Sequence, residues 1–217
     1  MHNFVDAWRG KYDSRKYSKK FYHDCLKKIQ NASTSKELSR CVIGLLHWKD
    51  GKVVEDSTGT FELEGVKYSL KNPRENTYCA NNDKNVIESR DFIKWAQNII
   101  KLTNFDLSQI EALRGNRFPL WTNQAIVIPS FVLHILNPKV YPLYDQHVER
   151  AKRTFLAEDL NKDARTLTLE NYQSYQAFFK EFVEGVPNKD GLDDIQHIKQ
   201  VDEALWSFGK FMKKKRR

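Results

Sequence analysis

The chain has 217 residues, of which 40% are hydrophobic, and its 36 Lys and Arg residues exceed its 28 Asp and Glu residues to give a net charge of +8. A chain of this length and composition can bury a sizeable core as one domain. Because a positive field concentrates polyanions, nucleic acid is the first partner to expect. Residues 213–217 are all Lys or Arg, so the folded body keeps only +3 once this predicted basic tail is set aside.

Composition also argues against several classes of protein. No apolar stretch approaches the roughly 18 residues that cross a bilayer, and no apolar signal core follows Met1, so we expect no membrane partner. The odd number of widely spaced cysteines indicates a reducing, cytoplasmic compartment, and we expect a monomer. Neither the cysteines nor the histidines are spaced as a disulfide framework or a metal-ligand set, and we predict no metal and no cofactor. The three cysteines are Cys25, Cys41 and Cys79.

The first third of the chain predicts two helices. Residues 14–30 place apolar side chains at three- and four-residue steps, which is typical of a helix with one buried face. Thr34 and Glu37 form a capping-box pattern at the start of a second helix over 35–48.

A small β-element and a loop follow these helices. From 52 to 70 the apolar residues alternate with a period of two between glycines, which predicts a β-hairpin. Residues 71–85 are polar and rich in Asn without any periodicity, so we expect a long loop there.

The remainder of the chain predicts helices with short joints. Ser89 begins one helix, and Asp106 caps a shorter one that ends at Gly115. We therefore expect a mainly α fold with a single domain over 1–212, which has possible sub-lobes at 1–85 and 86–212. The later helical segments are Phe131–Leu136, Val148–Leu156, Tyr172–Val183 and Val201–Met212.

The most informative segment runs from Gly115 to Phe155, where an apolar helix and a Pro-rich turn lead to Asp145 at the start of the next helix. An Asp in this position can accept hydrogen bonds from the first backbone N–H groups of the helix. On the residues alone, Asp145 is an N-cap.

The same segment resembles the helix-hairpin-helix DNA glycosylase superfamily. In that family an apolar helix and a short turn lead to an Asp followed by H-V-x-R, and the run here is D-Q-H-V-E-R from Asp145 to Arg150. The preceding helix and turn fill the family's spacing without a gap, and the likeness covers roughly 40 of the 217 residues. The resemblance implies a helical DNA-glycosylase-like domain that binds DNA.

Three departures from the family pattern qualify what the resemblance implies. The family's L-P-G-x-G hairpin aligns with residues 121–125, where only Asn123 adopts a left-handed backbone readily. The lysine of strand-cutting members aligns with Val127, so the resemblance implies a monofunctional enzyme that forms no Schiff base. No cysteine follows Cys79, so the family's iron–sulfur cluster is missing.

Asp145 is the candidate catalytic residue. Cleavage of an N-glycosidic bond develops positive charge on the sugar, and a fixed carboxylate in a water-poor site stabilises that charge and orients the attacking water.

The enzyme must also rotate the base out of the duplex into a pocket, which calls for a wedge and for aromatic walls. Arg117, Phe118 and Trp121 precede the apolar helix where a wedge would sit, although aromatic residues are more often part of a core. The candidate base-pocket residues are Trp121, His134, Tyr141, Tyr144 and His147, each with a structural role as its alternative.

Basic and amide side chains near these positions are candidates for DNA binding, and solvated surface charge is the alternative for the basic ones. These candidates are Arg117, Asn123, Gln124, Arg150, Lys152 and Arg153.

Three hypotheses follow. The first is a monofunctional DNA glycosylase that removes a damaged or modified base by base flipping and base excision, with a hypermodified cytosine of phage DNA in bacterial antiviral defence as a special case. The second is a non-catalytic helical module that binds DNA or a protein partner on a glycosylase-like scaffold. The third, a metal-dependent nuclease, has least support because no acidic or histidine cluster is present in the sequence pattern.

Overall fold

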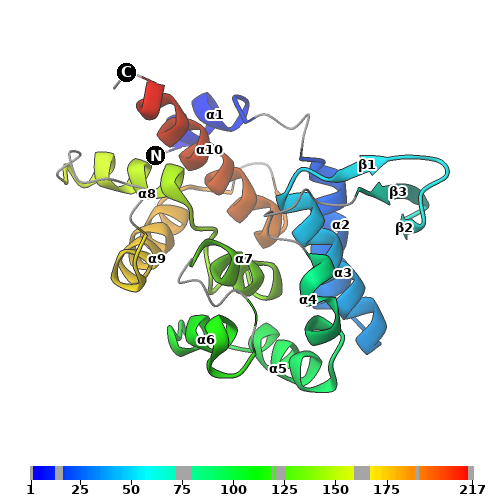
Figure 1. Cartoon of the computed structure of the whole chain (residues 1–217). Helices are drawn as coiled ribbons and strands as arrows, with labels where there is room; N and C mark the ends of the chain where they lie inside the picture. Colours follow the sequence, from blue (N-terminus) through cyan, green and yellow to red (C-terminus); the bar gives the residue numbers. More distant parts are fainter. Residues whose placement is uncertain are drawn as a thin grey trace.

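A computed structural model gives the fold of the chain, and it describes residues 2–12, 17–71, 80–118, 120, 126–158, 167–188 and 191–214. The described part is mainly helical with one small antiparallel sheet (Figure 1). In chain order the first elements are α1 (His2–Arg9), α2 (Lys19–Gln30), α3 (Ser35–Lys49), β1 (Val53–Glu55), β2 (Phe61–Leu63) and β3 (Val66–Leu70). The later helices are α4 (Ala80–Ile87), α5 (Arg90–Ile100), α6 (Ser108–Glu111), the π-helical η1 (Ala112–Asn116), α7 (Val127–Leu136), α8 (Gln146–Phe155), α9 (Leu169–Glu184) and α10 (Asp194–Lys214).

The first two predicted helices are present as α2 and α3. The Thr34 hydroxyl accepts from the Glu37 backbone N–H at 3.2 Å, which confirms the predicted helix start. The helix predicted from residue 14 begins later, because the Ser18 hydroxyl accepts from the Phe21 backbone N–H at 3.2 Å and caps α2 there.

The segment predicted as a hairpin, 52–70, forms a three-stranded sheet in the order β1-β3-β2. Strands β2 and β3 make a hairpin around Glu64 and Gly65, whose φ angles of 48° and 75° are the positive values that a tight two-residue hairpin turn requires. Strand β1 pairs with the other edge of β3 and places Val53 opposite Leu70. The period-two pattern therefore locates the strands but does not show how they pair.

The loop predicted over 71–85 is wrong in its last part, because helix α4 begins at Ala80. Ile87 at the end of α4 is fully buried, and the helix packs against α3. This burial stabilises a helix that the polar sequence does not announce. Residues 72–79 of the predicted loop lie outside the described part of the chain.

Helix α5 begins where the sequence predicts, whereas the helix predicted between Asp106 and Gly115 is divided into α6 and the π-helical η1. The Ser89 hydroxyl accepts from the Phe92 backbone N–H at 3.2 Å, so Ser89 caps α5 as expected. Asp106 accepts from the Ser108 backbone N–H at 2.9 Å at the start of α6. The chain leaves the helical path at Gly115, where φ is 113°.

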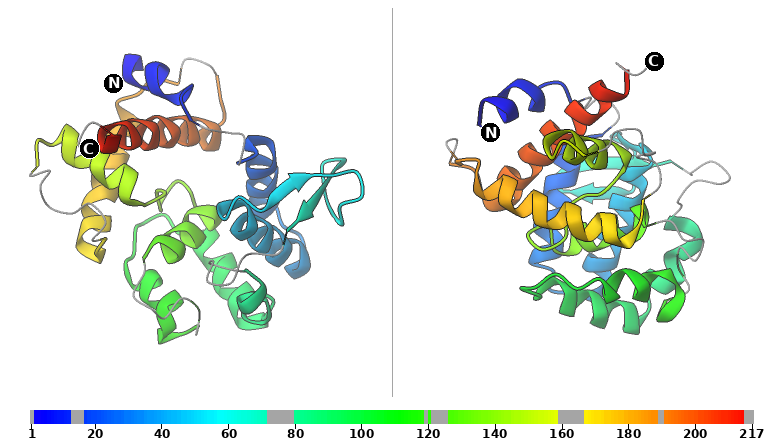
Figure 2. Two further views of the ribbon diagram at one scale, coloured as in Figure 1. Left: turned by 45° about the horizontal axis from the view of Figure 1, so that its top comes forward. Right: turned by 90° about the vertical axis from the view of Figure 1, so that its left-hand side faces the viewer.

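Helix α7 lies in the middle of the fold, and nearly all of its side chains are buried. Helix α10 runs along both α8 and α1, as the left view of Figure 2 shows clearly. One continuous hydrophobic core extends from α2 and α3 through α7 to α9 and α10. Among the described residues, no helix is long and apolar enough to cross a membrane.

Candidate active site

The candidate site begins at the first residue of the turn into α8. The Asp145 Oδ1 atom accepts from the backbone N–H groups of His147 at 2.7 Å and Val148 at 3.2 Å. Asp145 is therefore the N-cap that the sequence predicts, with an extended backbone that lets its side chain turn back over the first helical turn.

The second carboxylate oxygen of Asp145 is held from another helix. The Trp206 Nε1–H group of α10 donates to Asp145 Oδ2 at 3.0 Å. Asp145 is half-buried, and none of the described Lys, Arg or His side chains forms an ion pair with it. A carboxylate offers about four lone-pair positions, so these three N–H donors leave it able to accept one more hydrogen bond.

Asp145 lines a cavity of about 520 Å³ between α3, α7, α8 and α10. Aromatic side chains supply much of its wall, namely Tyr12, Tyr17, Trp48 and Trp206. Val127, the position that aligns with the lysine of strand-cutting glycosylases, lines the same cavity at the start of α7. Asp145 and Val127, the two positions to which the resemblance assigns the family's key residues, therefore line the same cavity.

A buried ion pair forms another part of the cavity. The Lys199 Nζ atom lies 2.8 Å from Asp202 Oδ2 on α10, and both residues are almost fully buried. Burial is the largest single influence and would lower the pKa of the Lys199 ammonium, but Asp202, Tyr12, Tyr22 and Glu203 together outweigh it and hold the pKa above its usual value. Lys199 is thus a cation at neutral pH and not a free amine.

Two further side chains of α8 face this region. Burial lowers the pKa of His147, whose ring stands edge to face with Trp206 at a centroid distance of 5.0 Å. The Gln146 Oε1 atom is buried and has no hydrogen-bond partner. A buried amide oxygen without a donor is costly, so this position can accept from a ligand N–H or O–H group.

A close approach of two helices holds the site together. A side chain at Gly209 on α10 would place its Cβ atom 1.9 Å from the His147 carbonyl oxygen on α8. The Arg150 guanidinium donates to the Gly209 carbonyl oxygen at 3.1 Å. Only glycine permits this contact, which brings Trp206 to the Asp145 carboxylate.

Tyr144 and His147 line the cavity, but the predictions that His134 and Tyr141 contact a base are wrong. His134 Nδ1 donates to the Tyr141 carbonyl oxygen at 2.8 Å, and its Nε2 atom accepts from the Tyr22 hydroxyl. Burial lowers the pKa of His134 to about 3, so it is a neutral core residue.

Tyr141 and Tyr144 are also held from within the protein. The Tyr141 hydroxyl donates to the Asp106 carbonyl oxygen at 3.4 Å, and this side chain is fully buried. The Tyr144 hydroxyl donates to Glu149 Oε2 at 3.1 Å, so Tyr144 contributes its aromatic ring to the cavity wall and not its hydroxyl group.

The prediction that Arg150, Lys152 and Arg153 bind phosphates is wrong. All three are 6% exposed or less. Arg153 Nε donates to Glu149 Oε1 at 2.6 Å, and Lys152 Nζ lies 3.4 Å from the same oxygen atom. Because α8 is packed between α9 and α10, its charged face is turned inward, where Lys152 and Arg153 pair with Glu149 and Arg150 donates to the Gly209 carbonyl oxygen.

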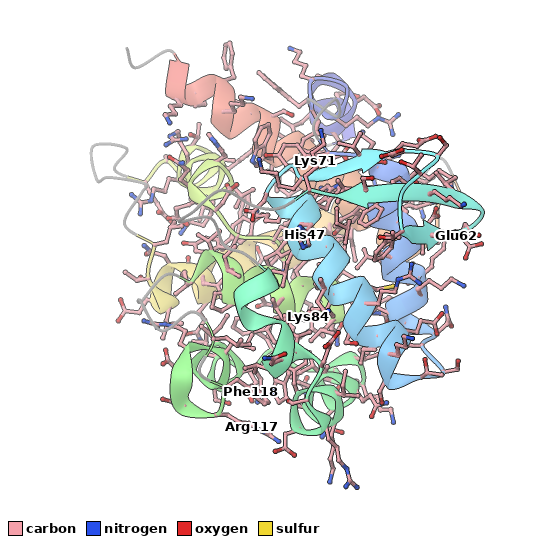
Figure 3. All side chains as sticks on the ribbon, turned by 45° about the vertical axis from the view of Figure 1, so that its right-hand side comes forward. His47, Glu62, Lys71, Lys84, Arg117 and Phe118 are labelled. Atoms are coloured by element: carbon pink, nitrogen blue, oxygen red, sulfur yellow. The ribbon has the colours of Figure 1, made fainter. Side chains whose placement is uncertain are left out.

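The other predicted residues lie elsewhere or outside the described chain. Arg117 is exposed, and its guanidinium lies 5.3 Å from the centre of the Phe118 ring. In the view of Figure 3, Arg117 and Phe118 lie near the bottom of the molecule, far from Lys71 near the top. Phe118 is buried among Phe92 and Trp95, so it is a core residue and not a wedge. Trp121, Asn123 and Gln124 lie outside the described residues.

Sequence reasoning missed the contribution of α10. Lys199, Asp202 and Trp206 recur at three- and four-residue steps, so they share one helix face. That face lies beside the apolar positions Val201 and Leu205, which are fully buried. Charged residues next to an apolar helix stripe are the one feature of the sequence that could have indicated that Lys199 and Asp202 are buried.

In the described part of the chain, no three His, Cys, Asp or Glu side chains are grouped so that they could hold a metal ion. The comparisons with known proteins add no relative, since no protein family, no curated protein and no solved structure matches the chain.

Proposed function

We propose that the protein is a monofunctional DNA glycosylase in which Asp145 promotes hydrolysis of the N-glycosidic bond of a damaged or modified base. The observation that carries this proposal is the place of the Asp145 carboxylate, which three N–H donors hold at the wall of an aromatic cavity of about 520 Å³. Cavities of several hundred Å³ are typical of sites for small ligands, and an extruded nucleotide belongs to that class.

The geometry suits the proposed chemistry at the sugar. As the bond to the base breaks, positive charge develops on deoxyribose, and a carboxylate with no competing cation stabilises it. The lone pair that Asp145 retains can accept from the attacking water. Trp48 and Trp206 offer ring faces and edges that suit a planar base.

The monofunctional part of the proposal rests on Val127 and on Lys199, the more deeply buried of the two lysines that line the cavity. A Schiff base requires an unprotonated amine, whereas Lys199 is paired with Asp202 at 2.8 Å. Val127 stands where the lysine of strand-cutting relatives would be. We therefore expect base release without a covalent enzyme–DNA intermediate.

The test is a base-excision screen on duplex and single-stranded oligonucleotides that carry damaged or modified bases, including hypermodified cytosines, followed by alkali. Wild-type protein should produce alkali-dependent strand breaks with at least one base. Asp145→Asn keeps the capping oxygen but not the negative charge, and it should reduce the rate by about 10²- to 10³-fold. Borohydride should trap no protein on the DNA.

One observation favours the second candidate, a non-catalytic module that binds DNA or a protein partner. The three cations of α8 expected to hold phosphates are buried, with Lys152 and Arg153 paired with Glu149 and Arg150 bound to the Gly209 carbonyl oxygen, which removes the predicted DNA contacts next to Asp145. If no base in the panel is released, and Asp145→Asn leaves DNA affinity unchanged, the module is the better description and the enzyme proposal fails.

A further inference from the structure

Asp145 and the two cavity lysines lie on different parts of the cavity wall, with Asp202 beside Lys199. Asp145 lies at one end, where Trp206 donates to it at 3.0 Å. Lys199 lies seven residues before Trp206 on α10, which corresponds to about 10 Å along the helix axis. Lys49, in the last turn of α3, also lines the cavity. A sugar and its base can lie between the carboxylate and these two ammonium groups.

Two lysine side chains, Lys49 and Lys199, line one end of the cavity. Lys199 is paired with Asp202, and Lys49 is close enough to act on the same carboxylate. Lys49 has no ion-pair partner of its own among the described residues. Asp50 also acts on Lys49, and Glu203 on Lys199, but neither carboxylate lines the cavity. At this end a ligand therefore meets two ammonium groups and the Asp202 carboxylate.

Aromatic rings hold the Lys199 ammonium in place. Its Nζ atom lies 5.0 Å from the ring centre of Tyr12, 5.1 Å from that of Tyr22 and 5.8 Å from that of Trp48. Rings at these distances attract a cation and restrict its motion. The Lys49 ammonium is similarly placed, 5.2 Å from the ring centre of Phe131.

Resting on the proposed function, we propose that Lys49 and Lys199 form the leaving-group end of the site and stabilise the negative charge that develops on the departing base. The bond between C1′ and the base nitrogen breaks with its electron pair on the nitrogen, so charge of opposite sign develops on sugar and base. Asp145 faces the positive sugar, and the two ammonium groups face the negative base. A cavity with only the Asp145 carboxylate would stabilise the positive charge on the sugar but not the negative charge on the departing base.

The step balances without any other reactant. Water adds its oxygen to C1′, its released proton passes through Asp145 to solvent, and the base anion takes a proton from solvent after it leaves. Neither ammonium group gives up a proton, so both act through charge and hydrogen bonding alone. The pairing of Lys199 with Asp202 fits this role, because it keeps the lysine charged.

The test measures whether the cavity prefers an anionic pyrimidine, by calorimetric titration of the full chain. The probes are 5-nitrouracil, which is an anion at neutral pH, uracil, which is neutral and nearly the same shape, and inorganic phosphate. We expect 5-nitrouracil to bind at least about tenfold more tightly than uracil, because a direct charge contact at the effective dielectric near a protein surface contributes more than the roughly 1.4 kcal/mol that this factor represents. Equal affinities would overturn the inference, and phosphate competing with 5-nitrouracil would assign the two lysines to the DNA backbone instead.

Variants locate the effect. Lys49→Met and Lys199→Met should each remove most of the preference for 5-nitrouracil and leave uracil binding unchanged. Lys94→Met, an exposed position on α5, is the matched control and should keep the full preference. If Lys199→Met fails to fold because Asp202 loses its partner, the half-buried Lys49 carries the test alone.

The two proposals fail separately. A preference for 5-nitrouracil that depends on Lys49, in a protein that releases no base from DNA, removes the glycosylase proposal and leaves an anion-binding cavity. Base release by a protein that binds uracil and 5-nitrouracil equally well removes only the role of the lysines.

Discussion

Helix α8 carries two groups of charged residues that differ in what surrounds them. Asp145, at its first turn, is held by N–H donors and opens onto a cavity. One turn later Glu149 is fully buried with Arg153 and Lys152, and we call these three residues the α8 ion cluster. The comparison shows that burial of charge alone does not mark a functional site, because Glu149 and Glu158 hold the cations of this cluster and none of its residues lines the cavity.

The largest effect on stability is expected from removing the carboxylate of the α8 ion cluster. Glu149→Ala leaves the Arg153 and Lys152 charges buried without their partner, and the free energy of unfolding should fall by about 3–5 kcal/mol. Urea denaturation measures the change.

The control is Glu158→Ala, which removes a partly exposed carboxylate that lies 3.6 Å from Lys152. This variant should change stability by less than about 1 kcal/mol. Equal losses in the two variants would show that Glu149 is not the centre of a closed cluster.

Two histidines predicted for the base pocket differ in their surroundings: His134 is buried in the core, whereas His147 lines the cavity. Burial lowers the pKa of His134 to about 3, so between roughly pH 6.5 and 3 the unfolded chain binds one more proton there than the native protein. The free energy of unfolding should therefore fall by about 1.4 kcal/mol for each pH unit of acidification in this window.

His134→Gln isolates that contribution, because its amide can donate to the Tyr141 carbonyl oxygen and accept from Tyr22 without titrating. Chemical denaturation at pH 6 and pH 5 should show a smaller dependence on pH in the variant than in the wild type. An unchanged pH dependence would place His134 in contact with solvent and return it to the candidate pocket.

Much of the fold could be predicted because local patterns determine it. The capping residues Ser89 and Thr34 mark helix starts in the sequence as they do in the structure. The pairing of β1 with β3 and the helix at Ala80–Ile87 could not be predicted in this way, since both depend on contacts with residues distant along the chain.

The candidate site could be predicted only where its chemistry lies in one segment. Asp145 and His147 belong to the run that resembles the glycosylases, and both line the cavity. Lys199 and Asp202 come from a helix more than fifty residues later, and no local pattern connects them to Asp145. Sequence reasoning also treated Arg150 as a surface residue, because a charged helix shows its buried face only when its neighbours are known.

The smallest expected effect on stability comes from the neighbour of Asp145. Gln146 Oε1 is buried beside the cavity without a hydrogen-bond partner, unlike the oxygens of Glu149 in the α8 ion cluster. Gln146→Met replaces the amide with an apolar group of similar shape, so the free energy of unfolding should stay constant or rise by about 1 kcal/mol. If this oxygen is left free for a ligand, the same variant should bind uracil about tenfold more weakly, because a ligand N–H group loses its acceptor.

Thermal denaturation and calorimetric titration of one protein sample give both numbers. Gln173→Met, at an exposed position of α9, provides the matched control and should change neither. A loss of stability in Gln146→Met would mean that the amide stabilises the native protein, so that Gln146 would have a structural role like that of the α8 ion cluster. Stability retained together with weaker binding is the pattern of a residue that is kept for its ligand, since the native protein then tolerates an unsatisfied polar atom that an apolar side chain would remove.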